Sequence, residues 1–561
     1  MERSPQVRSR PSTSATSLSK DAGETGVEPA MARPDERALV SGIVSVATFS
    51  WFIGYYGLVC IRPDWGGDFQ LYCAGIARLY RDLLHPLHEA IDLPSSQSTL
   101  YNPGLVGLAL IGKLVGATPF GALQIAGIFN LVLFAAGACF LFSRASIHRE
   151  WWLAAACFVM VTLLLRWYHF GWASEISLTN LQYIQPYAGT FAWGLAFIAF
   201  GLLEDLRKRG RWIELVALTA ILSLLLSIHM FTASWVTGVT GLFAIWVSIR
   251  QRSVRPLAWA AVALCAALVP ALLWPYAPFM DQFGDTPLVR SIRFINSGEP
   301  WAQAPLASFP TLYALGLPCF AYVWWRLRRH GFWFVALIAS LAMVLLLREL
   351  GQSQVARYAA LVVFFPQFIV AEVATLGVLA LLGPLPELPP ERKFARCDRP
   401  LSIAVLSVAA FSWLVSPMRA TAKQTEDWGG LPSIRALLRR PSAQAAYYRQ
   451  FSDVAPYIHP TDVVMMPAWR AVLDFASITG ASVVATPLAM RVTDDNERAD
   501  AVARFFDTET SGETRLWIAH QYGATKILVP SSAFQLLPAL TETFGEPIFQ
   551  GEERALFAIE P

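Results

Sequence analysis

The chain has 561 residues, with 44 Lys and Arg against 41 Asp and Glu, so its formal net charge is only +3. Charged residues make up 15% of the chain and hydrophobic residues 55%, whereas soluble domains are roughly 25% charged. These figures exclude a soluble globular enzyme, and the near-neutral balance gives no electrostatic footprint for nucleic acid. We therefore expect a polytopic α-helical protein whose first partner is the lipid bilayer.

The N-terminal region divides into two parts. Residues 1–37 are rich in Ser, Pro and Thr and have no hydrophobic pattern, so we expect them to be disordered. The apolar run at 38–61 is longer than the core of a secretory signal, and no small-residue cleavage site follows it. We interpret this run as a retained membrane anchor.

Basic clusters set the predicted topology, because Lys and Arg of short membrane loops lie on the cytoplasmic side. The gap 212–249 is long enough for two spans of about 20 residues each, with an outer turn near His229. The polar stretches at 281–299 and 348–357 then also lie outside. The clusters that carry this argument are at 207–211, 250–255, 326–329 and 392–399.

The number of crossings depends on the run 104–142, which fits either one long span plus a re-entrant piece or two spans. At about 20 apolar residues a span, we expect about 11–13 crossings in a transmembrane domain at 38–416. The first outer loop of that domain is predicted at 62–102. A last span near 401–416 carries the rest of the chain to the outer face.

Residues 417–561 are interpreted as an extracytoplasmic α/β domain. The region has no glycine-rich phosphate loop, nucleophile elbow or zinc-ligand spacing. We therefore favour a recognition or scaffolding role over independent catalysis. Short strands are predicted near 462–467, 482–487 and 525–530, and helices near 497–506 and 513–522.

The first outer loop carries the candidate chemistry. Asp68 follows two glycines and lies just beyond an apolar span, and glycines let the backbone bend close to a ligand. A carboxylate in that place suits deprotonation of a hydroxyl, so Asp68 is the predicted general base. The alternative is that Asp68 is a solvated loop residue or the N-cap of a helix whose spacing resumes at Leu71. A cap and a base are compatible roles.

The same loop resembles a known family. Residues 67–74 are Gly-Asp-Phe-Gln-Leu-Tyr-Cys-Ala, Arg-Leu-Tyr follows, and the loop closes with Tyr101-Asn102-Pro103. This pattern resembles the first outer loop of GT-C glycosyltransferases, of the polyprenyl-phosphate-mannose-dependent family 87 type, and the added tail is similar to that of arabinosyltransferases. The similarity covers 62–116. The chain departs from the family where Tyr-Pro-Pro is usual and lacks the Asp-x-Asp of some relatives.

The resemblance implies a GT-C-like fold and an inverting transfer of a sugar from a polyprenyl-phosphate donor to a glycan or glycolipid acceptor of the cell envelope. It places this activity on the extracytoplasmic face of the inner (plasma) membrane and maps the family's base onto Asp68. The leaving group is then a lipid phosphate, whose developing charge needs cations or hydrogen-bond donors near the membrane interface.

Three residues are predicted to hold the donor phosphate, namely His229, Arg348 and Arg357. A histidine on this face has that role in related GT-C proteins, but His229 is equally consistent with a hydrogen bond to a neighbouring helix. Guanidinium groups fork onto phosphate oxygens, which favours Arg357. For Arg348 a snorkelling anchor is the favoured alternative.

Polar and aromatic side chains of the outer segments are predicted to line the sugar and acceptor. The segment 167–187 is rich in them, although such residues also form ordinary interfacial belts. Asp64 and Asp68 could share a divalent cation, but two carboxylates make a weak site, so we expect no required metal or cofactor. The lining residues are Tyr72, His85, His88, Glu89, Tyr101, Tyr168, His169, Glu175, Gln182, Gln185 and Tyr187.

Two other function classes stay open on the sequence alone. A lipid or sugar transporter or flippase predicts paired repeats and broken helices in mid-membrane, and the sequence has no convincing internal repeat. A noncatalytic membrane scaffold, whose tail domain binds a partner, predicts that Asp68→Asn leaves every phenotype intact.

Overall fold

The structure is a computed structural model of the chain. It describes residues 34–63, 65, 68–94, 98, 100–164, 181, 184–276, 310–327, 330–349, 358, 361–382, 434–439, 442–467, 471–486, 492 and 494–560. Residues 1–33 of the predicted disordered tail (1–37) and the predicted last span at 401–416 lie outside the described residues, whereas residues 34–37 are helical and not disordered. The anchor begins at Pro34, slightly earlier than the predicted 38, because helix α1 includes the polar turn that precedes the apolar run.

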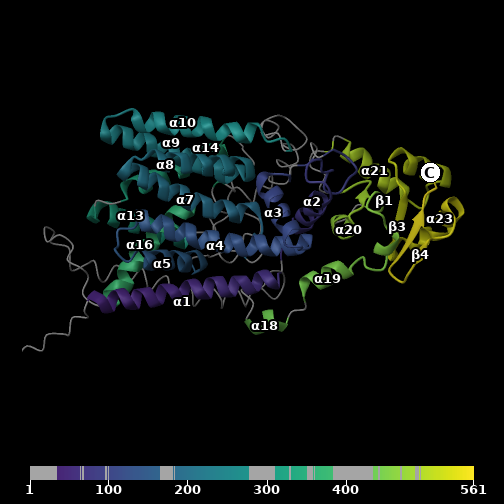
Figure 1. The fold of residues 1–561 in the computed structure, drawn as a ribbon, viewed down its shortest axis with the longest axis horizontal. Coiled ribbons are helices and arrows are strands. Elements are labelled where there is room, and N and C mark those ends of the chain that lie inside the picture. The colour runs from purple at the N-terminus through teal and green to yellow at the C-terminus, as the bar shows by residue number, and fades with distance from the viewer. Residues whose placement is uncertain are drawn as a thin grey trace, which may run out of the picture.

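A bundle of long apolar helices forms one half of the molecule (Figure 1). Six helices in the described part, α1, α4, α7, α9, α10 and α16, are long and apolar enough to cross a bilayer, which confirms the predicted membrane class. The helices of the bundle are α1 (Pro34–Ile61), α4 (Pro119–Ala145), α5 (Trp151–Leu164), α7 (Ala188–Arg209), α8 (Trp212–Ile228), α9 (Met230–Gln251), α10 (Arg255–Leu272), α13 (Pro310–Leu327), α14 (Gly331–Glu349) and α16 (Phe364–Leu381).

Glycines allow α4 and α7 to pack closely in the centre of the bundle. A Cβ atom added at Gly137 would lie 2.5 Å from the carbonyl oxygen of Gly194, so neither position has room for a side chain. Small residues at helix interfaces are typical of membrane proteins, where association depends on van der Waals packing. Around this contact lie the buried aromatic rings of Phe134, Phe158 and Trp193.

The two ends of the bundle differ in charge. The basic clusters at 207–211 and 250–255 lie where α7 and α9 end and where α8 and α10 begin. At the other end lie the turn at His229, helix α2 and the C-terminal domain (Figure 1). The expected pair of helices in the gap 212–249 is confirmed, with His229 between α8 and α9.

Two short helices connect the bundle to the C-terminal domain (Figure 1). Helix α2 (Phe69–Arg81) is amphipathic and buries the face that carries Leu71, Ile76 and Leu79. Helix α3 (Pro103–Leu114) has 12 residues and is therefore about 18 Å long, too short for a hydrocarbon core of roughly 30 Å. The run 104–142 thus contains one short helix and one long span, α4.

The C-terminal domain is α/β, as predicted. Its sheet has the order β2-β1-β3-β5-β4, with β1 parallel to β2 and β3, and β5 antiparallel to β3 and β4. Strands β4 and β5 and helices α20 and α23 were not predicted. The elements are α18 (Ile434–Arg439), α19 (Ala443–Arg449), the 3-10 turn Ala455–Tyr457, β1 (Val463–Met465), α20 (Ala471–Thr479), β2 (Ser482–Val483), α21 (Asp495–Phe505), α22 (Gly512–Gln521), β3 (Lys526–Pro530), the 3-10 segment Ser531–Leu536, α23 (Leu537–Phe544), β4 (Phe549–Gln550) and β5 (Arg554–Ala558).

The two faces of this sheet belong to different cores. Alternate residues of a strand point to opposite faces. Val464 and Leu528 pack in the same core as α2 and α20, whereas Met465 and Ile527 pack in a second core with α21, α22 and α23. The domain is therefore built onto α2 through one full face of its sheet.

Candidate functional site

Asp68 occupies the N-cap position of α2. Its side chain makes no capping hydrogen bond to the helix, while its backbone carbonyl accepts a bond from the Tyr72 N–H at 3.1 Å. The residue is exposed. The carboxylate thus stands at the start of a helix without serving as its side-chain cap, and it is reachable from outside the protein.

Tyr72 and Tyr187 join the starts of α2 and α7. Their rings stack with centroids 5.2 Å apart and an interplanar angle of 18°. Burial, and after it the negative charge of Asp68, raises the pKa of both phenols above the usual value, while backbone hydrogen bonds from Ala188 to Tyr72 and from Phe69 to Tyr187 act in the opposite direction. The two protonated phenols and the Asp68 carboxylate therefore share one neighbourhood.

His229 lies against the first turn of α7. Its Nδ1 is 2.9 Å from the hydroxyl of Thr232 and accepts the Thr232 backbone N–H at 3.4 Å, so it caps α9. With Nδ1 as the acceptor, a neutral ring carries its proton on Nε2. A Cβ added at Gly189 would lie 3.5 Å from that Nε2. His229 thus lies next to Gly189, which is two residues after Tyr187 in the chain.

The N-termini of three helices meet at this place. Asp68 begins α2, Tyr187 begins α7 and His229 begins α9, and the contacts of Tyr72 and Gly189 bring the three starts together. The N-terminal end of a helix carries a partial positive charge, so converging N-termini favour a bound anion.

The described structure places only part of the predicted phosphate-binding set. Tyr358, which follows Arg357 in the chain, packs its ring edge-to-face on Phe231, with centroids 5.8 Å apart. Arg357 itself, the side chain of Arg348, and Tyr168, His169, Glu175 and Gln182 lie outside the described residues.

Four predicted lining residues are buried in the protein. The Nδ1 of His88 accepts the N–H groups of Ala90 and Ile91, both at 3.3 Å. The Tyr101 hydroxyl donates to the Leu87 carbonyl at 2.5 Å. These two residues, Glu89 and Gln185 are all buried.

Gln185 and His85, both predicted to line the site, differ in burial. The Gln185 side chain donates from Nε2 to the Tyr56 carbonyl at 2.8 Å, which ties the segment before α7 to α1. His85 has the opposite environment, because its side chain is 85% exposed and lies 4.0 Å from Asp82. The structure thus brings Asp68, Tyr72, Tyr187 and His229 together and leaves His85 apart on the surface.

Helix α2 is fastened at its other end by an arginine that the sequence analysis missed. Arg78 is 4% exposed and donates to the Gly480 carbonyl at 3.1 Å and to the Ser482 hydroxyl at 2.7 Å. Arg81 also donates to the Thr479 and Gly480 carbonyls at the end of α20. A cation at the C-terminal end of a helix is favoured by the helix dipole.

The chain segment after α2 adds a strand-like contact to the sheet. The Val483 N–H donates to the Ala90 carbonyl at 2.8 Å, and Ile91 pairs with Val483 in a parallel bridge. The first outer loop therefore covers the β2 edge of the sheet. Asp68, at the start of α2, is held in place from the C-terminal domain as well as from the bundle.

A buried acidic residue lies in the interface between α2 and the domain. Asp474 of α20 is buried, and burial raises its pKa to about 7, while a hydrogen bond from Tyr447 acts in the opposite direction. Asp474 in turn contributes to raising the pKa of the Cys73 thiol on α2, for which burial is the larger cause.

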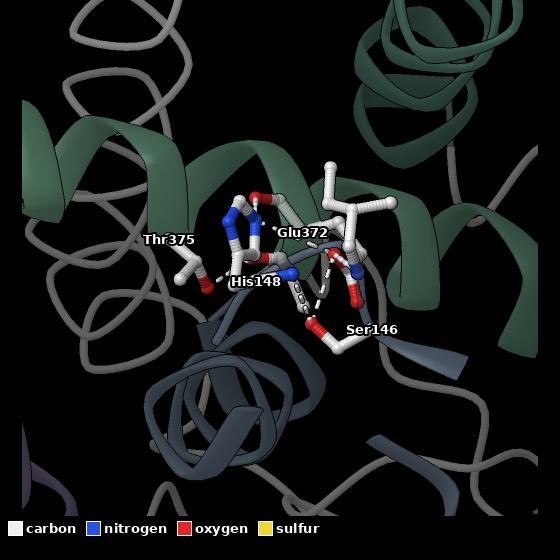
Figure 2. Close-up of polar contacts among 6 residues, drawn as sticks. Ser146, His148, Glu372 and Thr375 are labelled. Carbon is white, nitrogen blue, oxygen red and sulfur yellow. Dashed lines mark hydrogen bonds and ion pairs between the residues drawn. The ribbon is translucent and has the colours of Figure 1, made fainter. Parts of the chain in front are cut away.

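A second polar cluster joins α16 to the turn after α4 (Figure 2). Glu372 of α16 is 0% exposed. Its Oε2 accepts the Ile147 N–H at 3.2 Å and the Ser146 hydroxyl at 3.3 Å, and Nε2 of His148 lies 2.9 Å from the Glu372 carbonyl oxygen. Burial lowers the pKa of His148 to about 4, so the ring is neutral at pH 7 and donates a hydrogen bond rather than forming an ion pair. The sequence analysis missed this cluster, whose sequence signal is a glutamate within an apolar run.

Metal ligands do not cluster in the described part of the chain, where no group of three or more His, Cys, Asp or Glu residues could hold an ion. Asp64, the proposed partner of Asp68 for a cation, lies outside the described residues.

Comparisons with known proteins give similarities at low identity. No protein-family model matches the chain, and no curated protein matches it. ArnT from Cupriavidus metallidurans, bound to undecaprenyl phosphate, is 13% identical, with 94% of this chain and 100% of that chain covered and a TM-score of 0.47. The Archaeoglobus fulgidus oligosaccharyltransferase tethered with an acceptor peptide is 13% identical, with 91% and 71% covered and a TM-score of 0.44. At this identity and score, such similarities assign no activity to the chain.

Proposed function

We propose that this protein is a membrane-embedded inverting glycosyltransferase of the GT-C type, with Asp68 as its general base. The observation that carries the proposal is the meeting of an exposed carboxylate, two stacked tyrosines and a histidine at three helix N-termini. This place is at the end of the bundle opposite the basic clusters. By the positive-inside rule it faces away from the cytoplasm.

The reaction needs a single displacement. The oxygen of an acceptor hydroxyl bonds to the anomeric carbon of the sugar while the bond from that carbon to the phosphate oxygen breaks. The hydroxyl proton moves to the Asp68 carboxylate, and the electron pair of the broken bond stays on the polyprenyl phosphate. Attack from the side opposite the leaving group inverts the anomeric carbon. A positioned base of this kind contributes roughly 10²–10⁴-fold to the rate.

The leaving phosphate needs hydrogen-bond donors at the point where its charge develops. The Nε2–H of His229 and the N-terminal ends of α7 and α9 suit this role, because His229 lies against the first turn of α7, which begins next to Tyr187 of the stacked pair. Arg357 is the further cation that we propose for the phosphate, and Arg348 is a weaker candidate. No divalent cation is required by this scheme.

The acceptor is proposed to be a glycan or glycolipid of the cell envelope. The C-terminal domain packs on α2, whose first residue follows Asp68, so an acceptor bound by that domain reaches the base without crossing the bilayer. In this scheme the stacked tyrosines hold the start of α2 and contribute an aromatic surface on which a sugar ring stacks.

The proposal is tested with the full chain reconstituted in lipid vesicles. A panel of radiolabelled polyprenyl-phosphate sugars is offered together with envelope glycolipids, and transfer of label is measured for wild type and for Asp68→Ala. We expect one donor to lose its sugar to an acceptor in the wild type alone. Release from no donor, or equal transfer by Asp68→Ala, would rule the proposal out.

A further inference from the structure

A cavity of about 260 Å³ lies at the basic end of the bundle. It is bounded by the ends of α7 and α9 and by the starts of α8 and α10. This volume is far larger than the roughly 30 Å³ that one water molecule occupies in the liquid. The cavity is at the end of the bundle opposite Asp68, so its occupancy is independent of the proposed transfer reaction.

The cavity combines a basic rim with an apolar floor. Its rim is formed by the last turn of α7 and the first turn of α10, and its floor by leucine, valine and phenylalanine side chains of the spanning helices. The rim residues are Arg207, Lys208, Arg209 and Arg255, and the floor includes Leu203, Leu218, Phe243 and Val247.

Part of this positive charge is already neutralised. Arg207 pairs with Glu204 at 2.8 Å, and Arg209 lies 3.8 Å from Asp205. Both acidic residues are buried. Two of the four cations therefore serve as partners of buried carboxylates, and Asp205 also pairs with Arg144 at 3.0 Å.

The other two rim cations, Lys208 and Arg255, are in excess of these two carboxylates. Within the described residues, no acidic side chain forms an ion pair with Lys208 or Arg255, and the Lys208 ammonium donates a hydrogen bond to the Arg144 carbonyl. The Arg255 guanidinium lies over the ring of Trp259, 4.3 Å from its centroid, and both residues line the cavity. The rim thus has a net positive charge that favours an anion.

A polar group inside the cavity also lacks a partner. Thr240 is 1% exposed, lines the cavity, and its hydroxyl has no hydrogen-bond partner among the described residues. A buried hydroxyl without a partner costs free energy, and an oxygen of a bound molecule would supply one.

The depth of the cavity matches the membrane interface. Trp212 is 73% exposed at the start of α8, and Trp259 stands beside the cavity on α10. Tryptophan is enriched where spanning helices meet the headgroup region. The two tryptophans therefore predict that the cavity lies at the level of the headgroups.

We propose that this cavity binds an anionic membrane lipid of the leaflet at the basic end. The phosphodiester headgroup lies between Lys208 and Arg255, and the upper part of an acyl chain lies on the apolar floor. Basic pockets between spanning helices are suited to such headgroups. A free phosphate ion satisfies the rim alone, because a strongly hydrated ion gains nothing from the floor formed by Leu203, Leu218 and Phe243.

The test is native mass spectrometry of the full chain released from neutral detergent micelles with equimolar phosphatidylcholine and phosphatidylglycerol added. We expect wild type to retain phosphatidylglycerol in preference to phosphatidylcholine. The double variant Lys208→Gln/Arg255→Gln leaves the ion pairs of Glu204 and Asp205 intact, and each lost charge should weaken binding about fivefold. Thr240→Val keeps the volume of the side chain and should also weaken binding.

The matched control is Arg149→Gln/Arg250→Gln, which removes two charges from the same end of the bundle without touching the cavity lining. It should retain the lipid as wild type does. The proposal is overturned if this control loses the lipid as strongly as the cavity variant, if phosphatidylcholine is retained equally, or if equimolar inorganic phosphate displaces phosphatidylglycerol.

Discussion

Asp68 precedes helix α2, Glu372 lies within the apolar helix α16, and the two acidic side chains have opposite environments. Asp68 is exposed at the start of α2, whereas Glu372 is fully buried in α16 and accepts hydrogen bonds from Ile147 and Ser146. A carboxylate that takes a proton from a substrate must be reachable. A carboxylate sealed among helices instead fastens them, as Figure 2 shows for α16 and the turn after α4.

An acidic residue in a membrane protein is therefore not a catalytic residue by virtue of its depth alone. Ionisable groups within membrane helices are costly and therefore usually functional. Here the buried Glu372 accepts hydrogen bonds from within the protein, and the exposed Asp68 lies beside tyrosines and converging helix N-termini. Access and surroundings, rather than burial, single out Asp68.

The largest expected effect compares these two acids directly. Asp68→Asn should lower the rate of sugar transfer roughly 10²–10⁴-fold, because an amide cannot accept the hydroxyl proton. Glu372→Gln keeps an acceptor oxygen for Ser146 and Ile147 and should leave transfer within a few-fold of wild type. Both rates are measured at matched amounts of folded protein. A folded Glu372→Gln variant as inactive as Asp68→Asn would contradict the different roles assigned to the two acids.

The second prediction concerns the support of α2. Arg78→Gln removes donors to Gly480 and Ser482, and bonds from a charged group contribute about 1.5–3 kcal/mol each. We expect a clear drop in the melting temperature and faster proteolysis between α2 and the C-terminal domain. Arg435→Gln, an exposed position in α18, is the matched control and should change neither. Equal stability of the two variants would show that Arg78 does not hold the domain.

The third prediction separates two roles of His229. Asn is a good N-cap, so His229→Asn should keep the bond to Thr232 while removing the Nε2–H. Loss of one hydrogen bond to a charged phosphate corresponds to roughly 10–100-fold in donor affinity. We expect KM for the donor to rise in both His229→Asn and His229→Ala, and stability to fall only in His229→Ala. Unchanged KM in His229→Asn would remove His229 from the donor site.

The smallest expected effect is a pH dependence of the interface at Asp474. Because its folded pKa of about 7 is above the ordinary value near 4, the stability it contributes is present at low pH and is lost as pH rises through 7. The melting temperature should therefore fall between about pH 4 and pH 7 by more in wild type than in Asp474→Asn. Parallel pH profiles of the two proteins would contradict this assignment.

Much of the architecture could be predicted from local patterns. Apolar run length and basic clusters predicted the turn at His229, and short β-branched runs predicted β1, β2 and β3. Strand β5 was missed because Arg554–Ala558 contains one arginine and no β-branched residue. Helix α3 remained ambiguous because a continuous apolar run does not show where one helix ends and the next begins.

The candidate site was less predictable because its contacts span the whole chain. Arg78 and Gly480 are separated by 402 positions, and no local pattern pairs an arginine with a distant carbonyl. His88 and Gln185 have the composition of lining residues, but their partners are backbone groups of other segments. Asp68 and Tyr72 were accessible to sequence analysis because the motif that contains them is local.

The most direct measurement is single-turnover sugar transfer at saturating polyprenyl-phosphate donor, with donor binding determined on the same reconstituted samples. For Asp68→Asn the account predicts wild-type donor affinity together with a rate constant roughly 10²–10⁴-fold lower. A wild-type rate constant in Asp68→Asn, or a loss of transfer fully explained by lost donor binding, would contradict the assignment of Asp68 as the base.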